Sequence, residues 1–218
     1  MLWRTRKKEA PRPEPIPDVP DPRREPLVYT SPGLEGLTRR LRKDGTYRIL
    51  DLGSAQGANV EFFSAYSCRI RIVDFHGAVT ERQEAQEPSA PLDQTLLSDL
   101  ATDTGPFDVI LAWDLLNYLD RPQLARVMAR LTHLSRAGTN LLAFMHTQGD
   151  IPAHPPAYRI LNGKTLSCGP GDPDLRPGPG YSPAELEQLF EGFGGLRAFL
   201  LRHGPMEYLL SRPGPTDA

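Results

Sequence analysis

The apolar residues of this chain follow two alternating patterns, short continuous runs and helical stripes. A short continuous run indicates a buried strand, and a stripe at i, i+3 and i+4 indicates a helix packed on one face. The runs predict strands over residues 48–52, 69–74, 94–97, 107–113 and 139–145. The stripes predict helices over residues 31–43, 58–66 and 121–134, and the capping box Ser182-Pro183-Ala184-Glu185 opens another helix. Strands that alternate with helices predict a parallel sheet covered by helices on both faces.

The C-terminal part of the pattern differs from the rest. Two strands, about 196–202 and 207–211, are joined by the turn His203-Gly204-Pro205. A tight turn makes these two strands antiparallel neighbours. The predicted fold class is therefore α/β, a three-layer αβα Rossmann-like sheet of about seven strands, mostly parallel with an antiparallel C-terminal hairpin strand.

Two segments interrupt the pattern. Residues 1–30 contain seven prolines between Pro11 and Pro26 among charged residues, so we expect a disordered tail. Residues 147–181 contain seven prolines and six glycines around a short strand-like piece, Tyr158–Leu161. A loop of this length is typical of a lid, and the alternative is a surface insertion. One domain over residues 31–212 and a disordered end over 213–218 follow from these boundaries.

The lid hypothesis depends on what residues 147–181 carry. Their apolar and aromatic groups would be wasted in solvent, and their cations Arg159, Lys164 and Arg176 suit an anionic acceptor. We therefore expect the segment to cover a pocket and to close when a cofactor or acceptor binds.

Charge and composition limit the classes of partner and the location that we expect for this protein. The formal net charge is −2, from 25 basic and 27 acidic residues, which does not favour nucleic acid as a partner. The first ten residues have a local basic excess that suits an anionic surface or a partner, and a solvated tail is the alternative. No apolar run approaches the ~18 residues of a membrane span, so the expected location is the cytoplasm. Cys68 and Cys168 have no metal-ligand spacing, so we expect reduced thiols and no metal site.

The clearest functional signal is the segment Ile49-Leu50-Asp51-Leu52-Gly53-Ser54-Ala55-Gln56-Gly57. A buried strand ends in an acid, a glycine turn follows, and a helix begins, so the helix N–H groups face a ligand. Dinucleotide sites use G-x-G-x-x-G and carry their acid only after the second strand. Asp51 inside the turn would repel a pyrophosphate and attract an ammonium group. The expected ligand has a cationic amino-acid end and no phosphates.

This segment resembles the first motif of the Rossmann-like (class I) S-adenosylmethionine-dependent methyltransferases, acid-x-Gly-x-Gly-x-Gly, with Ala55 in place of the middle glycine. The resemblance covers about residues 31–212. It implies S-adenosylmethionine as the cofactor. It also implies that the turn binds this cofactor through Asp51, Gly53, Ser54, Ala55 and Gly57.

Two later aspartates stand where the family carries cofactor ligands. The resemblance implies that Asp74, after the second strand, binds the ribose and that the Phe75 ring packs against the adenine. A solvated aspartate is the alternative for Asp74. It implies that Asp99, after the third strand, receives the adenine amino group and that Leu100 packs on the ring. A helix cap or turn aspartate is the alternative for Asp99.

The fourth strand and its continuation, Phe107–Leu119, also resemble the family. Asp114, Asn117 and Tyr118 follow this strand, and by resemblance they line the methionine end of the cofactor and the substrate pocket. The candidates for a general base are His146, after the fifth strand, and Tyr118; an exposed polar side chain with no catalytic role is the alternative for His146.

These observations predict a methyltransferase whose acceptor is a small molecule rather than nucleic acid. The alternative is a non-catalytic relative that keeps the fold as a binding or scaffold module, since Ala55 departs from the motif and no acid–base pair is evident. An enzyme of NAD or nucleotide sugars is disfavoured by Asp51.

Overall fold

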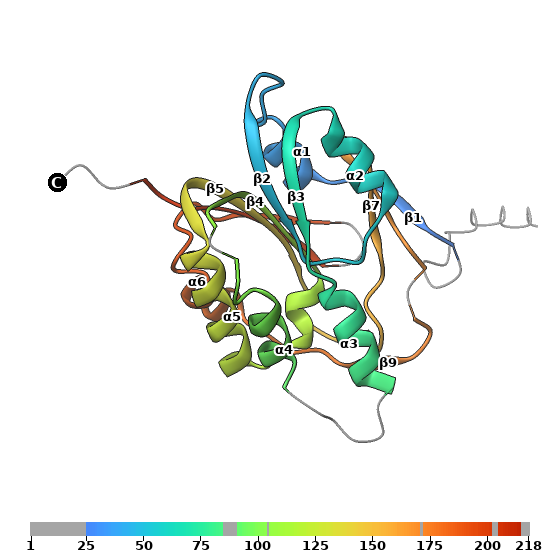
Figure 1. Cartoon of the computed structure of the whole chain (residues 1–218). Helices are drawn as coiled ribbons and strands as arrows, with labels where there is room; N and C mark the ends of the chain where they lie inside the picture. Colours follow the sequence, from blue (N-terminus) through green and yellow to red (C-terminus); the bar gives the residue numbers. More distant parts are fainter. Residues whose placement is uncertain (1–24, 85–90, 104, 171, 202–204, 215–218) are drawn as a thin grey trace, which may run out of the picture.

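A six-stranded sheet forms the centre of the computed structural model, which describes residues 25–84, 91–103, 105–170, 172–201 and 205–214. In their order across the sheet, its strands are β10 (Arg197–Leu200), β11 (Met206–Ser211), β5 (Ser135–Met145), β4 (Phe107–Trp113), β2 (Thr46–Asp51) and β3 (Ser67–Ile72). β2, β3, β4 and β5 are parallel, whereas β11 is antiparallel to β5 and to β10 (Figure 1). The predicted α/β class and the antiparallel C-terminal hairpin strand are confirmed.

Helices cover both faces of this sheet, which gives three layers (Figure 1). One face carries α1 (Pro32–Thr38) and α2 (Gly57–Ser64). The other carries α4 (Leu92–Asp99), α5 (Arg121–His133) and α6 (Pro183–Leu189), and α3 (Phe75–Glu84) packs against α4. In the described part of the chain, no helix has the length and apolar character that crossing a bilayer requires.

Local sequence sets where several helices begin. The Ser31 side chain accepts a hydrogen bond from the backbone N–H of Leu34 and so caps α1. Capping boxes open α5 at Asp120 and α6 at Ser182, and proline occupies the first turn of all three helices. The capping box predicted at Ser182 is confirmed.

The central strands are buried because they are apolar on both faces. Residues 109–113 of β4 and 139–145 of β5 are all buried. Parallel strands with helices on both sides have this near-continuous burial, unlike the alternating burial of a strand with one wet face. Their carboxyl ends form the edge at which open α/β sheets bind ligands.

The strand predicted near residues 94–97 is wrong, because these residues lie inside α4. Leu92, Leu96 and Leu100 are buried at a spacing of four residues, and Asp93 pairs with Arg126 of α5. The short apolar run therefore follows a helical period and packs against a neighbouring helix. The described sheet has six strands instead of about seven.

The predicted tail boundary at residue 30 is also wrong. Leu27–Thr30 form a strand, β1, that pairs antiparallel with β8 (Thr165–Cys168), and β8 pairs in turn with β7 (Tyr158–Asn162). The strand expected at Tyr158–Leu161 is confirmed as β7. Residues 1–24 and 215–218, the rest of the expected tails, lie outside the described residues.

The segment 147–181 has more regular structure than a plain loop. Besides β7 and β8 it contains β6 (Asp150–Pro152) and β9 (Leu175–Pro177), which pair with each other. The small sheet β1-β8-β7 lies beside α2 (Figure 1), and β7 contacts this helix directly. Residues 147–181 therefore bring β7 against α2, the helix that follows the glycine turn.

Candidate functional site

The glycine turn leaves the sheet where β2 ends, and α2 begins at Gly57. Asp51 is almost fully buried, and its Oδ1 accepts hydrogen bonds from the Gly53 backbone N–H at 2.9 Å and from the Trp113 indole N–H at 2.7 Å. Burial raises the pKa of Asp51, while hydrogen bonds from Trp113 and Gly53 act in the opposite direction. The carboxylate that the sequence assigns to a ligand ammonium is therefore bonded within the protein.

Trp113, the last residue of β4, packs against the glycine turn. It is buried, and it has φ of +52°, the one positive φ outside glycine among the described residues. A Cβ at Gly53 would lie 2.8 Å from the Trp113 ring, closer than carbon atoms approach without strain. Gly53 thus makes room for an indole ring of the same chain.

The ring of Tyr158 stacks on the ring of Trp113. The two rings are parallel within 1°, and their centroids are 5.4 Å apart. Tyr158 reaches this place because β7 is held to α2 by Asn59, whose side chain donates to the Tyr158 carbonyl at 3.2 Å and accepts from the Ile160 N–H at 2.8 Å. The Asn59 amide therefore satisfies one backbone carbonyl and one backbone N–H of β7, as a neighbouring strand would do in a sheet.

Two further hydrogen bonds hold the segment in place. The Arg159 Nε–H donates to Oε1 of Gln56 in the turn at 3.0 Å. His76, which follows β3, places Nε2 2.8 Å from the Pro155 carbonyl. Residues 155–160 therefore contact the turn, α2, the start of α3 and the end of β4.

The space left beside Gly53 is about 10 Å³. It is lined by Gly53, Ser54, Gln56, His76, Trp113, Leu115, Pro156, Ala157 and Tyr158. Pockets for drug-sized ligands and cofactors measure roughly 300–1,000 Å³. In this structure Trp113 and Tyr158 fill the cleft, and S-adenosylmethionine does not fit into it.

The other residues predicted to bind the cofactor have separate environments. Asp74 is exposed, and its Oδ1 accepts a hydrogen bond from the Gly77 N–H at 2.8 Å within the first turn of α3. Phe75 is buried in the core, so its ring offers no open face to an adenine. Asp99 is exposed at the end of α4 and Leu100 is buried beside it, and neither lines the space at Gly53. Because Asp99 ends a helix, α4, and does not follow a strand, it lies away from the glycine turn.

Asp114 follows Trp113 and is buried, and its Oδ1 has no hydrogen-bond partner among the described residues. Burial raises the pKa of this carboxyl to about 8. A buried carboxyl with so high a pKa at the carboxyl end of a strand is a feature typical of functional sites.

The Asn117 side chain ties the ends of β4 and β5 together. Its amide donates to the carbonyls of Asp114 at 2.6 Å and Phe144 at 2.8 Å, and its oxygen accepts from the His146 N–H at 2.8 Å. These bonds use both amide hydrogens and the oxygen within the protein, so we interpret Asn117 as a structural residue.

The two candidate bases are poorly placed for proton transfer in this conformation. The Tyr118 hydroxyl donates to the Pro152 carbonyl at 2.9 Å, and burial raises the Tyr118 pKa. Burial lowers the pKa of His146, which favours its neutral form at pH 7. Neither residue lines the space beside Gly53.

The residues that fill the cleft could not be identified from the sequence. Trp113 ends an apolar strand, so its sequence context indicates a core residue. The context of Asn59 indicates an ordinary polar residue of α2. Tyr158 was expected to cover a pocket, yet its stacking on Trp113 depends on the path of the chain between β5 and β7.

Residues 49–138 match the family model of the methyltransferase domain. The matched segment begins in β2, includes the glycine turn and ends in β5. For this part of the chain, the match confirms the resemblance to class I methyltransferases and supports S-adenosylmethionine as the cofactor. No curated protein matches the chain.

Several solved structures are similar in shape. The 1,6-didemethyltoxoflavin-N1-methyltransferase from Burkholderia thailandensis has 16% identity, and the match covers 84% of this chain and 77% of that one with a TM-score of 0.46. Human N-acetylserotonin methyltransferase has 14% identity over 83% of this chain and 51% of its own, with a TM-score of 0.47. A TehB-like S-adenosylmethionine-dependent methyltransferase from Corynebacterium glutamicum has 13% identity over 83% and 87%, with a TM-score of 0.44. The chain thus spans about half the length of the human enzyme.

Proposed function

We propose that this chain is an S-adenosylmethionine-dependent methyltransferase that acts on a small-molecule acceptor. The observation that carries the proposal is the match of residues 49–138 to a methyltransferase domain, with Asp51 and Gly53 at a strand–turn–helix junction inside it. A carboxylate at this position attracts the ammonium group of such a cofactor, whereas it would repel the phosphate of a nucleotide ligand.

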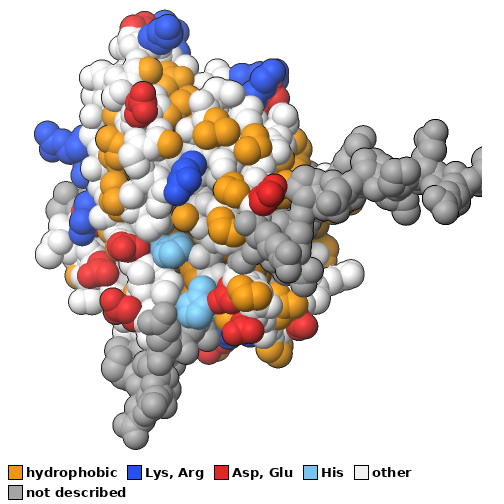
Figure 2. All heavy atoms as spheres, turned by 90° about the vertical axis from the view of Figure 1, so that its right-hand side faces the viewer, with side chains coloured by type: hydrophobic (Ala, Val, Ile, Leu, Met, Phe, Trp, Pro, Cys, Tyr) orange, Lys and Arg blue, Asp and Glu red, His pale blue; other side chains and the backbone are white. Residues whose placement is uncertain are grey.

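Charge favours a small acceptor over nucleic acid in this proposal. The formal net charge is −2. Figure 2 shows the face on which α2, β1 and β7 lie, and the described basic side chains visible there are few and separated. Proteins that bind nucleic acid usually gather basic residues on one face. The free thiols Cys68 and Cys168 suit the reducing cytoplasm, which is the location we propose.

Cofactor binding in this proposal requires residues 155–160 to leave the cleft. The movement would separate the stacked rings of Tyr158 and Trp113 and would break the two hydrogen bonds that Asn59 makes to β7. Residues 147–181 then act as a lid that opens for the cofactor, in place of the closing motion expected from the sequence. The apparent affinity falls by the fraction of molecules in which the lid is open.

A non-catalytic binding or scaffold module is the second candidate, and one observation favours it. Trp113 and Tyr158 fill the cleft so completely that about 10 Å³ remains, and the Asp51 carboxylate is already bonded. A chain that had lost methyl transfer would be free to stabilise its domain in this way.

Calorimetric titration with S-adenosylmethionine and S-adenosylhomocysteine separates the two candidates. The variant Tyr158→Ala removes the ring that fills the cleft, and Tyr47→Ala is the matched control, because Tyr47 packs edge-on against Tyr66 at the opposite end of β2. We expect Tyr158→Ala to bind S-adenosylhomocysteine about tenfold more tightly than the wild type, since it removes a competitor for the site. Tyr47→Ala should keep the wild-type affinity.

The outcomes are distinct. Absence of binding by both the wild type and Tyr158→Ala would reject the cofactor proposal. Equal affinities would show that Tyr158 does not compete with the cofactor and would reject the lid. A third outcome is that the chain binds the cofactor tightly but converts no S-adenosylmethionine to S-adenosylhomocysteine with any member of a broad acceptor panel. This outcome would favour the non-catalytic module.

A further inference from the structure

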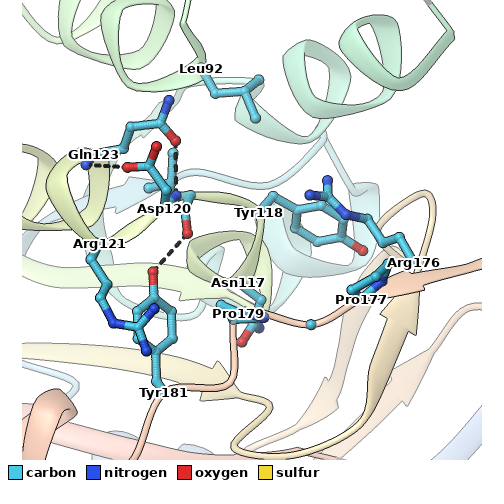
Figure 3. Close-up of a pocket in the computed structure, with 12 residues that line it drawn as sticks. Leu92, Asn117, Tyr118, Asp120, Arg121, Gln123, Arg176, Pro177, Pro179 and Tyr181 are labelled. Carbon is cyan, nitrogen blue, oxygen red and sulfur yellow. Dashed lines mark hydrogen bonds between the residues drawn. The ribbon is translucent and has the colours of Figure 1, made fainter.

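A larger hollow lies apart from the filled cleft, between α4, the start of α5 and the chain that follows β9 (Figure 3). Its volume is about 510 Å³, within the range of small-molecule pockets. It shares no lining residue with the space beside Gly53. We call it the arginine groove, because its walls include Arg121 and Arg176.

Each arginine is stacked on a tyrosine that also lines the groove. The Arg121 guanidinium lies 5.3 Å from the centre of the Tyr181 ring, and the Arg176 guanidinium lies 5.8 Å from that of Tyr118. Figure 3 shows these two pairs on different sides of the groove. The tyrosine hydroxyls donate to the backbone carbonyls of Leu119 and Pro152, which holds both rings. A guanidinium stacked on a fixed ring loses less freedom when it binds a ligand.

Three charged residues line the groove, Asp120, Arg121 and Arg176. Arg121 pairs with Glu185 at 2.7 Å. The Asp120 carboxylate accepts a hydrogen bond from the Gln123 N–H and caps α5. The half-buried Arg176 guanidinium has neither a hydrogen-bond acceptor nor an ion-pair partner among the described residues, and it lines the groove. As far as the described residues show, the groove therefore presents a cation whose hydrogen bonds are unused.

We propose that the arginine groove binds a small organic carboxylate. The planar guanidinium of Arg176 matches a carboxylate with two parallel hydrogen bonds. Pro177 and Pro179 also line the groove and offer apolar surface to the body of such a ligand. Binding there does not require the cleft beside Gly53 to open, so it can be tested without S-adenosylmethionine.

Saturation-transfer difference NMR with benzoate and benzamide tests this site on the full chain. The two probes share ring and size, and only benzoate carries the charge. We expect benzoate to bind about tenfold more tightly than benzamide, and Arg176→Gln to weaken benzoate by a similar factor, since a charge-assisted pair is lost. Arg197→Gln, an exposed arginine on β10, is the matched control and should leave binding unchanged.

Three results would overturn the site. The first is the absence of benzoate binding. The second is equal affinity for benzoate and benzamide, which would show that the guanidinium does not select the charge. The third is an equal loss in Arg176→Gln and Arg197→Gln, which would indicate a general effect of surface charge. The denaturation midpoint of each variant, compared with that of the wild type, shows whether a loss of binding reflects unfolding.

Discussion

The indole N–H of Trp113 donates a 2.7 Å hydrogen bond to the buried carboxylate of Asp51, across two strands that neighbour each other in the sheet. This bond joins the acid of the glycine turn to the aromatic residue that fills the cleft beside it. It explains how a chain can carry the turn of a cofactor site and still leave only a small space beside Gly53 in this conformation.

The variant Trp113→Phe tests the strength of this bond. Phenylalanine keeps an aromatic ring against Tyr158 but removes the donor, which leaves the buried Asp51 carboxylate with one fewer hydrogen bond. We expect the free energy of unfolding to fall by about 1.5–3 kcal/mol, measured by urea denaturation at pH 7. The double variant with Asp51→Asn should lose less than the sum of the two single variants. Strict additivity would show that the two side chains are not coupled.

Asp74 is predicted to act as a helix cap. Its Oδ1 accepts the Gly77 N–H at 2.8 Å, so Asp74→Ala leaves a donor in the first turn of α3 unpaired. Urea denaturation should show a loss of about 0.5–2 kcal/mol for Asp74→Ala and little change for Asp74→Asn, which keeps an acceptor. An equal loss in both variants would argue that charge, and not the cap, stabilises this helix.

The pH dependence of stability should carry a contribution from Asp114. Burial raises its pKa to about 8 in the folded protein, whereas an unfolded aspartate titrates near ~3.9. Between these values the folded protein holds a proton that the unfolded chain has released. The free energy of unfolding therefore falls as the pH rises from about 4 to about 8, and it becomes level above that range.

The comparison of Asp114→Asn with the wild type isolates this contribution, because the other buried carboxyl groups are common to both. We expect the wild type to lose about 2–5 kcal/mol more than the variant between pH 4 and pH 8. Urea denaturation across this range is the measurement. Parallel profiles would contradict a raised pKa at Asp114.

Two N-terminal deletions test the corrected domain boundary. Removal of residues 1–24 should leave the melting temperature nearly unchanged, because a polar, proline-rich segment buries little apolar surface. Removal of residues 1–30 also takes away β1, which pairs with β8 from Leu27 to Thr30. This longer deletion should lower the free energy of unfolding by about 2 kcal/mol or more, since it removes the ladder and the packing of Tyr29. Equal stability of the two shortened chains would contradict this role for β1.

Local patterns in the sequence determined much of the fold. The apolar runs at 107–113 and 139–145 are buried on both faces, so their identity as central strands follows from composition alone. The acid–glycine turn at Asp51 and Gly53 and the cap at Ser182 also depend on neighbouring residues only. Such features are predictable because the same few residues both encode and form them.

Tertiary structure decided the features that depend on distant residues. The run at 94–97 satisfies a strand pattern and a helix pattern equally well, and packing of α4 against α5 selected the helix. The state of the cleft depends on Tyr158 meeting Trp113 and on Asn59 holding β7, contacts between residues 45 and 99 positions apart in sequence. The sequence by itself determined that a cofactor-type turn exists, because its residues are contiguous. Whether that turn has room for a ligand was decided only by the folded chain, because the rings that fill the space come from other strands.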